Sequence, residues 1–248
     1  MLQLRPSSTL DGGDFGGLKA KHHFAVRPDG NPANGPLGAL MVWNDDEIAP
    51  GTGFGLHGHA NLEIISYVRE GLVTHRDSIG NVGRTEAGDV QAISAGAGIR
   101  HSEHNLGAEP LRMFQISLRP RVNGGEPHWS ARRFPNTDRA NQRVVLASGM
   151  PDDIDAIPIR TDGKVLGATL LAGGQLQYDL GDFHPAYLVP ARGSIEVNGI
   201  YLGMGDGIAA RDESRLTVST SEDAEIVGSN RLKSGRSNIG VMKTSRGE

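Results

Sequence analysis

Short hydrophobic or alternating runs follow one another along most of the chain, separated by glycine, proline or Asp-Gly turns. Side chains alternate between the two faces of a strand, so runs of this kind predict strands rather than helices. The expected strands cover residues 37–43, 62–69, 72–76, 89–93, 111–118, 143–147, 165–171, 175–180, 186–190, 194–198 and 224–228. Only residues 127–133 and 150–155 are candidates for short helical turns. The pattern predicts an all-β protein built from barrels or sandwiches.

The hydrophobic pattern also contains a faint internal repeat. The segment from Val68 turns at Gly71, returns as a strand and meets a Gly-Asp turn at residues 88–89. The segment from Val189 repeats this order, with Gly193 and the Gly-Asp turn at residues 205–206. Two related barrels in tandem would explain the repeat. The polar stretch 135–142 suggests a boundary, giving an N-terminal unit of residues 1–140 and a C-terminal unit of residues 141–248. Residues 229–248 are polar and read as a tail.

Composition narrows the classes of function. A net charge of -4 gives no electrostatic reason to expect direct contact with nucleic-acid phosphates. The chain has no cysteine, so any metal must be held by His, Asp or Glu. No apolar run approaches the roughly 20 residues of a membrane-spanning helix, and residues 1–10 lack the apolar core of a signal peptide. We therefore expect a soluble, cytoplasmic protein that does not contact membranes.

Two short motifs indicate a metal site. The first is His57-Gly58-His59, and the second, 42 residues after His59, is His101-Ser102-Glu103. Residues i and i+2 project from one face of a strand, so neighbouring strands would direct all four side chains into one space. Three imidazoles and a carboxylate suit a single divalent ion such as Fe(II), Mn(II), Ni(II), Cu(II) or Zn(II).

These motifs resemble those of a known family. The first cupin motif is matched by Gly51-Thr-Gly-Phe-Gly-Leu-His57-Gly-His59-Ala-Asn-Leu-Glu63, although Gly71 falls one residue later than the general pattern. The second is matched by the segment from Gly88 to Asn105, which contains His101-Ser-Glu103. More narrowly, His75-Arg-Asp-Ser-Ile-Gly-Asn81 and Ser94-Ala-Gly-Ala-Gly-Ile-Arg-His-Ser-Glu103 are similar to signatures of the pirin family, in particular its bacterial quercetin 2,3-dioxygenase-like branch. The resemblance covers residues 22–134 closely and extends loosely to Val227.

The resemblance implies a bicupin, two tandem double-stranded β-helix barrels of which the second lacks metal ligands. It assigns the ligands to His57, His59, His101 and Glu103, with Fe(II) as the expected ion. The second barrel can be checked by counting from its equivalent glycines. The offsets that lead from Gly71 and Gly88 to the three histidines lead from Gly193 and Gly205 to a set without histidine: Asp179, Gly181 and Val218.

The resemblance also implies an activity. The expected reaction is metal-dependent cleavage of the central ring of a flavonol such as quercetin by dioxygen, with release of carbon monoxide. Glu103 would accept the substrate's hydroxyl proton, and Met41, Phe54, Met113 and Gln115 would line the substrate pocket. The alternative is a non-catalytic, redox-sensing regulator that acts on transcription through protein partners, as eukaryotic pirins do.

Four further acidic or histidine residues are expected to have supporting or structural roles. Glu63 belongs to the first motif but is read as supporting the site or the fold, since Glu103 takes the ligand role. His75 is read as a hydrogen-bonding turn residue, and Asp45 with Asp46 as part of a turn.

Overall fold

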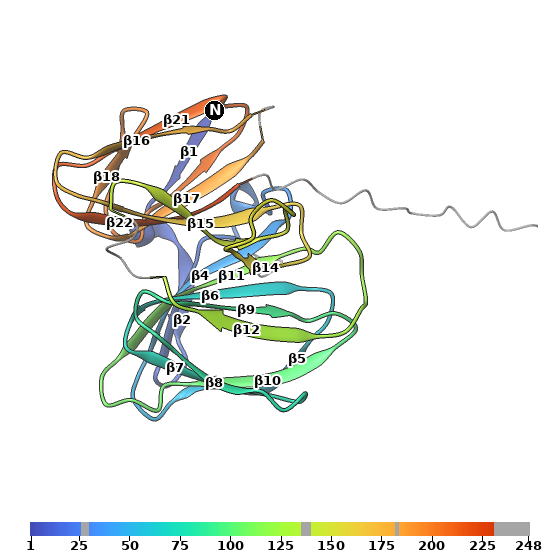
Figure 1. The fold of residues 1–248 in the computed structure, drawn as a ribbon. Helices are drawn as coiled ribbons and strands as arrows, with labels where there is room; N and C mark the ends of the chain where they lie inside the picture. Colours follow the sequence, from blue (N-terminus) through green and yellow to red (C-terminus); the bar gives the residue numbers. More distant parts are fainter. Residues whose placement is uncertain (26–29, 135–139, 182–183, 231–248) are drawn as a thin grey trace, which may run out of the picture.

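The structure is a computed structural model that describes residues 1–25, 30–134, 140–181 and 184–230. Residues 231–248 of the predicted tail and residues 135–139 of the predicted boundary lie outside the described residues. The rest is almost entirely β-structure, with 3-10 turns at η1 (Ser7–Thr9) and η2 (Pro32–Asn34). The predicted all-β class is confirmed (Figure 1). Among the described residues, no helix has the length and apolar character needed to cross a bilayer.

Two sheets form the first barrel. A seven-stranded sheet has the order β12-β9-β6-β11-β4-β3-β2, and a four-stranded sheet has the order β5-β10-β7-β8. The strands are β2 (Asp11–Asp14), β3 (Leu18–His22), β4 (Leu40–Ile48), β5 (Gly53–His59), β6 (Glu63–Glu70), β7 (Leu72–Asp77), β8 (Val82–Glu86), β9 (Val90–Ser94), β10 (Ile99–His104), β11 (Leu111–Leu118) and β12 (His128–Arg132).

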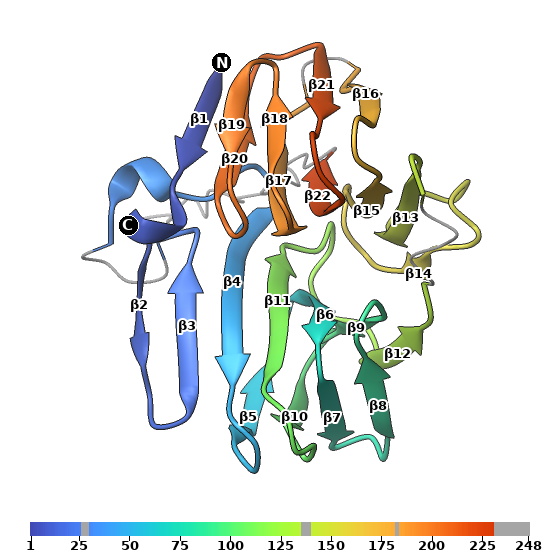
Figure 2. The same ribbon diagram turned by 90° about the vertical axis from the view of Figure 1, so that its left-hand side faces the viewer.

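The second barrel repeats this arrangement. Its larger sheet has the order β1-β20-β17-β22-β15-β13-β14, and its smaller sheet β16-β21-β18-β19. The strands are β1 (Leu2–Arg5), β13 (Arg143–Ser148), β14 (Ile157–Pro158), β15 (Lys164–Leu170), β16 (Gln175–Asp179), β17 (Ala186–Arg192), β18 (Ile195–Val197), β19 (Ile200–Leu202), β20 (Gly207–Ala210), β21 (Arg215–Ser219) and β22 (Ala224–Asn230). The edge strand β1 comes from the N-terminus and pairs antiparallel with β20 (Figure 2).

The internal repeat predicted from the sequence is a true structural repeat. Gly71 and Gly193 both have positive φ, at 77° and 68°, where an L side chain is strained. A Cβ at Gly71 would lie 2.7 Å from the Pro110 carbonyl oxygen, just before β11. At Gly193 it would lie 2.5 Å from the Asp223 carbonyl oxygen, just before β22. The two turns therefore occupy the same place in their barrels and need glycine for the same reason.

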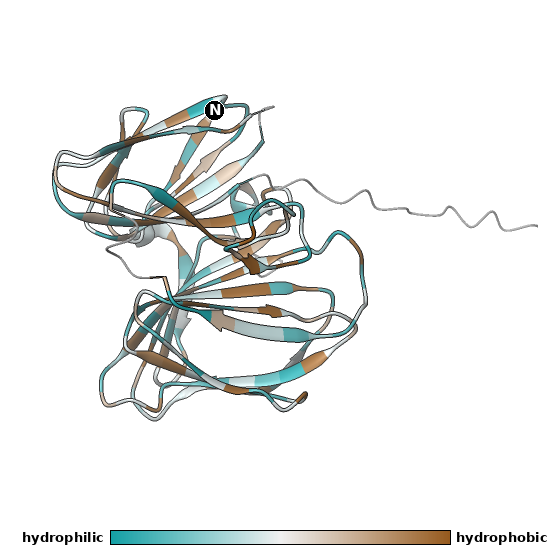
Figure 3. Cartoon of the chain, in the orientation of Figure 1, coloured by the Kyte–Doolittle hydropathy of each residue, from teal (hydrophilic) through white to brown (hydrophobic). Residues whose placement is uncertain are grey.

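The largest apolar core lies between the barrels. It joins Trp43 and Phe114 of the first large sheet to Tyr187 and Val227 of the second. Hydrophobic and hydrophilic residues alternate along many strands (Figure 3). In β11, Phe114 and Ile116 belong to the core between the barrels, whereas Met113 belongs to a separate cluster. Each large sheet thus keeps one face for its own barrel interior and gives the other to the junction.

The eleven predicted strands are all confirmed, but the helical interpretation of residues 127–133 is wrong. That segment is β12, which pairs with β9. Residues 150–155 form turns without a helix. Ten other strands of the described residues were not predicted, among them β2 with sequence Asp-Gly-Gly-Asp, because short polar or glycine-rich segments carry little hydrophobic alternation.

Candidate metal centre

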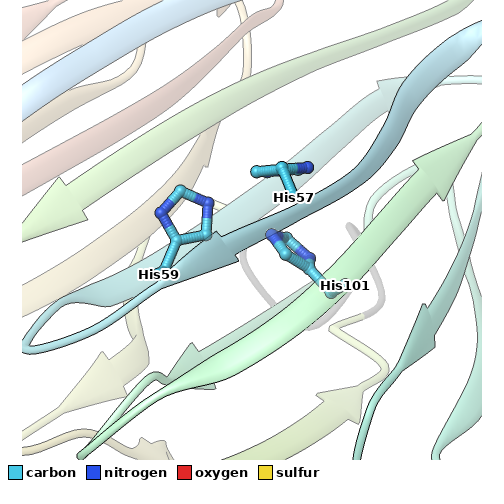
Figure 4. A group of neighbouring side chains, drawn as sticks. All are labelled: His57, His59 and His101. Carbon is cyan, nitrogen blue, oxygen red and sulfur yellow. The ribbon is translucent and has the colours of Figure 1, made fainter.

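Three histidines meet between neighbouring strands of the first barrel. His57 and His59 lie on β5, and His101 lies directly opposite His57 on β10. The ring centroids are 4.8 Å apart for His57 and His59, 4.4 Å for His57 and His101, and 5.1 Å for His59 and His101. One nitrogen from each ring lies within 4.8 Å of the others, close enough to surround one ion. Figure 4 shows the three side chains gathered across the two strands.

The protonation and hydrogen bonding of these rings fit a metal ion. Nδ1 of His57 donates a 2.7 Å hydrogen bond to the Gly55 carbonyl, which leaves Nε2 available as a ligand. His101 is fully buried, and within the part of the chain that the structure describes neither of its ring nitrogens has a hydrogen-bond partner. Burial, and then the neighbouring His57, lower the pKa of His101 to about 3. The ring is therefore neutral, as a metal ligand must be, and its unpaired nitrogens need a partner.

Glu103 lies two residues beyond His101 on β10, also fully buried. Its carboxylate accepts hydrogen bonds from Gln115 Nε2 at 2.8 Å, from Ser66 Oγ at 3.3 Å and from Gln91 Nε2. Burial raises the pKa of Glu103 to about 7, although these hydrogen bonds favour the charged form. Glu103 does not join the three-histidine group directly. It forms a second group of candidate ligands with His75 and His101, so His101 links the two.

His75 is a buried part of the site and not the turn residue expected from the sequence. It lies in β7, its Nε2 is 3.1 Å from an Asp77 oxygen, and its ring stacks on Trp129 at 5.0 Å and 4°. The ring centroid lies 5.5 Å from that of His101. The burial of His75 could have been predicted from the strand expected over residues 72–76. Alternation along that strand puts His75 on the same face as buried Val73.

Asp46 is a second residue that the sequence analysis placed wrongly. The predicted turn is the continuation of β4, and Asp46 is buried, with no hydrogen-bond partner for either carboxylate oxygen in the described segments. Burial, then Asp45 and Glu103, raise the pKa of Asp46 well above its usual value. Asp45 instead forms an ion pair with Arg69. The barrel interior around Glu103 therefore contains a further acidic group with no partner among the described residues.

The four residues predicted to line the substrate pocket lie in three different environments. Phe54 and Met113 lie in one apolar cluster, and the Phe54 ring centroid is 6.2 Å from that of His57. Gln115 donates a hydrogen bond to Glu103 and so lies at the polar network rather than in that apolar cluster. Met41 lies where the register between β4 and β11 shifts, and its sulfur accepts a 3.2 Å hydrogen bond from Arg119. The structure therefore does not group Met41 with the other three.

Glu63 supports the fold, in agreement with the sequence interpretation. It accepts hydrogen bonds from Ser94 Oγ at 2.6 Å and from the Arg160 backbone N–H at 3.1 Å. These bonds tie β6 to β9 and to the segment that precedes β15.

Over the described parts of the chain, both groups of three or more candidate metal ligands lie in the first barrel. In the second barrel, Val218 is buried and apolar at the offset of His101, and Asp179 forms an ion pair with Arg215. Two tandem barrels with a histidine cluster in one of them define a bicupin protein with a candidate metal site.

Comparison with known proteins gives the family. The family profile described as Pirin matches residues 6–118, and the profile described as quercetinase C-terminal cupin domain matches residues 145–227. A pirin-like protein of Caulobacter vibrioides is 54% identical over 92% of this chain and 98% of its own length. A quercetin 2,3-dioxygenase of Escherichia coli is 33% identical over 92% of this chain and 97% of its own.

A solved structure agrees with these matches. The crystal structure of a bacterial pirin from Escherichia coli in complex with nickel(II) superposes with a TM-score of 0.86 at 31% sequence identity, covering 93% of this chain and 98% of that one. The chain belongs to the pirin family.

Proposed function

We propose that this protein is a metal-dependent dioxygenase that cleaves the central ring of a flavonol such as quercetin and releases carbon monoxide. His57, His59, His101 and Glu103 would hold the ion, and Fe(II) is the proposed metal. The observation that carries the proposal is His101. Its two buried ring nitrogens have no hydrogen-bond partner in residues 1–25, 30–134, 140–181 and 184–230, and the imidazoles of His57 and His59 lie next to it. Relatives named quercetin 2,3-dioxygenase support the choice of reaction.

A bound divalent ion would act as a Lewis acid that makes the substrate's hydroxyl more acidic, and would mediate its reaction with dioxygen. The hydroxyl proton would pass to a carboxylate oxygen of Glu103. Burial raises the pKa of the Glu103 carboxyl, which favours its taking up a proton. Gln91 and Gln115 would hold the carboxylate in place for this transfer.

The apolar residues beside the histidines would bind the body of the substrate. Phe54 and Met113 share one cluster with Ile48 and Val73, next to His57. A flat aromatic ligand would bury apolar area there and exclude water from the reacting atoms. Both oxygen atoms of dioxygen would enter the ring-opened product, one in its ester carbonyl and one in its carboxylic acid, and the carbon between the two cleaved bonds would leave as carbon monoxide.

The test is anaerobic incubation of metal-loaded protein with quercetin, followed by admission of oxygen and measurement of carbon monoxide and of flavonol absorbance. We expect carbon monoxide from the wild type and almost none from Glu103→Ala. His104→Gln changes the next residue of β10, outside the proposed site, and should keep the activity. Metal-loaded wild type that releases no carbon monoxide would overturn the proposal. If its binding to protein partners then changed on metal oxidation, the regulatory alternative would be favoured.

A further inference from the structure

The second barrel contains a cavity of about 310 Å³ between its two sheets. Ligand pockets in proteins begin at about this size. Its walls come from β13, β15, β16, β17, β21 and β22, and its apolar lining includes Leu166, Leu176, Leu188, Val218 and Ile226. The second barrel is expected to hold no metal ion. Its side chains nevertheless leave this space between the sheets empty.

The cavity lies at the position that the metal centre and its polar network occupy in the first barrel. In the first barrel, Gln115 pairs in register with Ser66 on one side and Asn44 on the other. The equivalent residue of the second barrel, Gly228, pairs with Leu188 and Leu166. All three line the cavity, together with Val218 at the offset of His101. The second barrel thus has apolar residues around a cavity at positions where the first barrel has polar groups.

One end of the cavity is polar. Asn230 is buried and its Nδ2 donates to the Tyr178 hydroxyl, but its Oδ1 has no hydrogen-bond partner among the described residues. A buried acceptor without a donor is unfavourable, so this oxygen points to a missing hydrogen-bond donor. The Arg143 guanidinium lies 4.5 Å above the Tyr178 ring, at the exposed edge of the same wall. The acceptor and the cation both adjoin Tyr178 and so form one polar end.

We propose that the second barrel binds a small hydroxy acid in this cavity, independently of the metal centre. The apolar body of the ligand contacts Leu166, Leu188 and Val218. Its hydroxyl donates to Asn230 Oδ1, and its carboxylate meets Arg143. This site goes beyond the proposed dioxygenase function, which uses the first barrel alone. Aromatic and aliphatic hydroxy acids both have an apolar body, a hydroxyl and a carboxylate. The binding experiment below distinguishes between these two classes of ligand.

Isothermal titration of the full-length protein with 2-hydroxybenzoate and with 2-hydroxyoctanoate tests the proposal. At least one of them should bind with one site per chain, about tenfold more tightly than benzoate or octanoate, respectively, because only the hydroxy acid satisfies Asn230. Binding should be the same for metal-loaded and metal-free protein. That result separates this site from the first barrel, whether or not the dioxygenase proposal holds.

Three variants locate the binding. Asn230→Ala should abolish the preference for the hydroxy acid, and Arg143→Gln should weaken binding about tenfold. Arg192→Gln removes an exposed arginine of β17 outside the cavity and should leave binding unchanged. Ala168→Leu fills the cavity and should abolish binding while the metal content of the first barrel stays at the wild-type level. A single cooperative transition in urea unfolding, close to that of the wild type, shows that Ala168→Leu is folded.

The outcomes are decisive in both directions. Binding that disappears in Ala168→Leu and loses its hydroxyl preference in Asn230→Ala supports the site. Failure of both hydroxy acids to bind, or binding that folded Ala168→Leu leaves intact, overturns the proposal.

Discussion

The two barrels share a scaffold but differ in what they enclose. Strand order, register and turn glycines correspond between them. The first interior holds a network of Ser66, Gln91, Gln115 and Glu103 beside the histidines. Where Ser66 and Gln115 stand in the first barrel, the second has Leu188 and Gly228 around a cavity. The backbone interactions that define a barrel are therefore independent of its interior chemistry, and one copy can lose a metal site without losing its fold.

The largest expected effect concerns the histidine that the second barrel lacks. His101→Ala should lower metal affinity by about a hundredfold or more, since it removes a ligand from the centre of the cluster. Val218→Ala, at the equivalent position, should leave the metal content unchanged. Elemental analysis of both proteins, purified without added metal, gives the measurement. Equal metal loss in the two variants would contradict the assignment of metal to the first barrel alone.

The shared scaffold can be tested at its turns. Gly71→Ala and Gly193→Ala should each lower the free energy of unfolding by about 3 kcal/mol, because each places a Cβ against a carbonyl oxygen at positive φ. Gly80 also has positive φ, at 94°, but a Cβ there would meet nothing within 4 Å, so Gly80→Ala should be milder. Urea unfolding measures all three. A loss as large in Gly80→Ala would show that backbone strain alone, and not the close packing, explains the effect.

The junction between the barrels should make stability depend on pH. His23 is buried against Tyr187, with 2.8 Å between Nδ1 and the hydroxyl, and burial lowers its pKa to about 3. In the unfolded chain His23 takes up a proton near pH 6.5, whereas in the folded protein it stays neutral. The contribution of His23 to the free energy of unfolding is therefore fully present above pH 6.5 and is lost as the pH falls toward 3.

Lowering the pH from 7 to 5 should therefore cost about 2 kcal/mol through His23. His23→Gln should show a smaller fall in urea unfolding at the two pH values, whereas substitution of the exposed His128 by Gln should behave as the wild type. Equal falls in all three proteins would mean that the junction does not hold His23 neutral.

The smallest expected effect concerns the support of Glu103. Gln91→Leu gives the first barrel an apolar residue like Ile208, which lies at the same offset from Gly205 as Gln91 from Gly88. Loss of one hydrogen bond to the carboxylate should weaken metal binding about tenfold. Competition with a chelator measures it. Unchanged affinity, with the fold intact, would argue against Glu103 as a metal ligand.

Much of the fold could be predicted because short-range patterns in the sequence indicate its strands. Hydrophobic alternation located eleven strands, and the HxH and HxE spacing located the three histidines that the structure brings together. Asp46 was missed because Asn44, Asp45, Asp46 and Glu47 look like a polar turn, although they continue β4. Which of these four side chains is buried depends on how β4 pairs with β3 and β11. Local sequence patterns do not show this pairing.

The same limit applies to the cavity and to the partners of Glu103. Ser66, Gln91 and Gln115 come from three strands and converge only once the strands are in register. Gln115 was expected in the substrate pocket, but it hydrogen-bonds Glu103. Its partner was on a strand of the opposite sheet, which the sequence alone does not identify. Small residues such as Gly228 do not reveal whether they leave empty space.

The position of β1 means that the two barrels cannot be divided by a single cut. The first five residues complete the edge of the later sheet beside β20, where β12 lies in the earlier one. A C-terminal fragment that began at β13 would present β20 as a bare edge, with unpaired N–H and C=O groups open to other chains. An N-terminal fragment would carry a strand with no sheet to join. During synthesis, β1 can form its hydrogen bonds with β20 only after residues 207–210 have emerged from the ribosome.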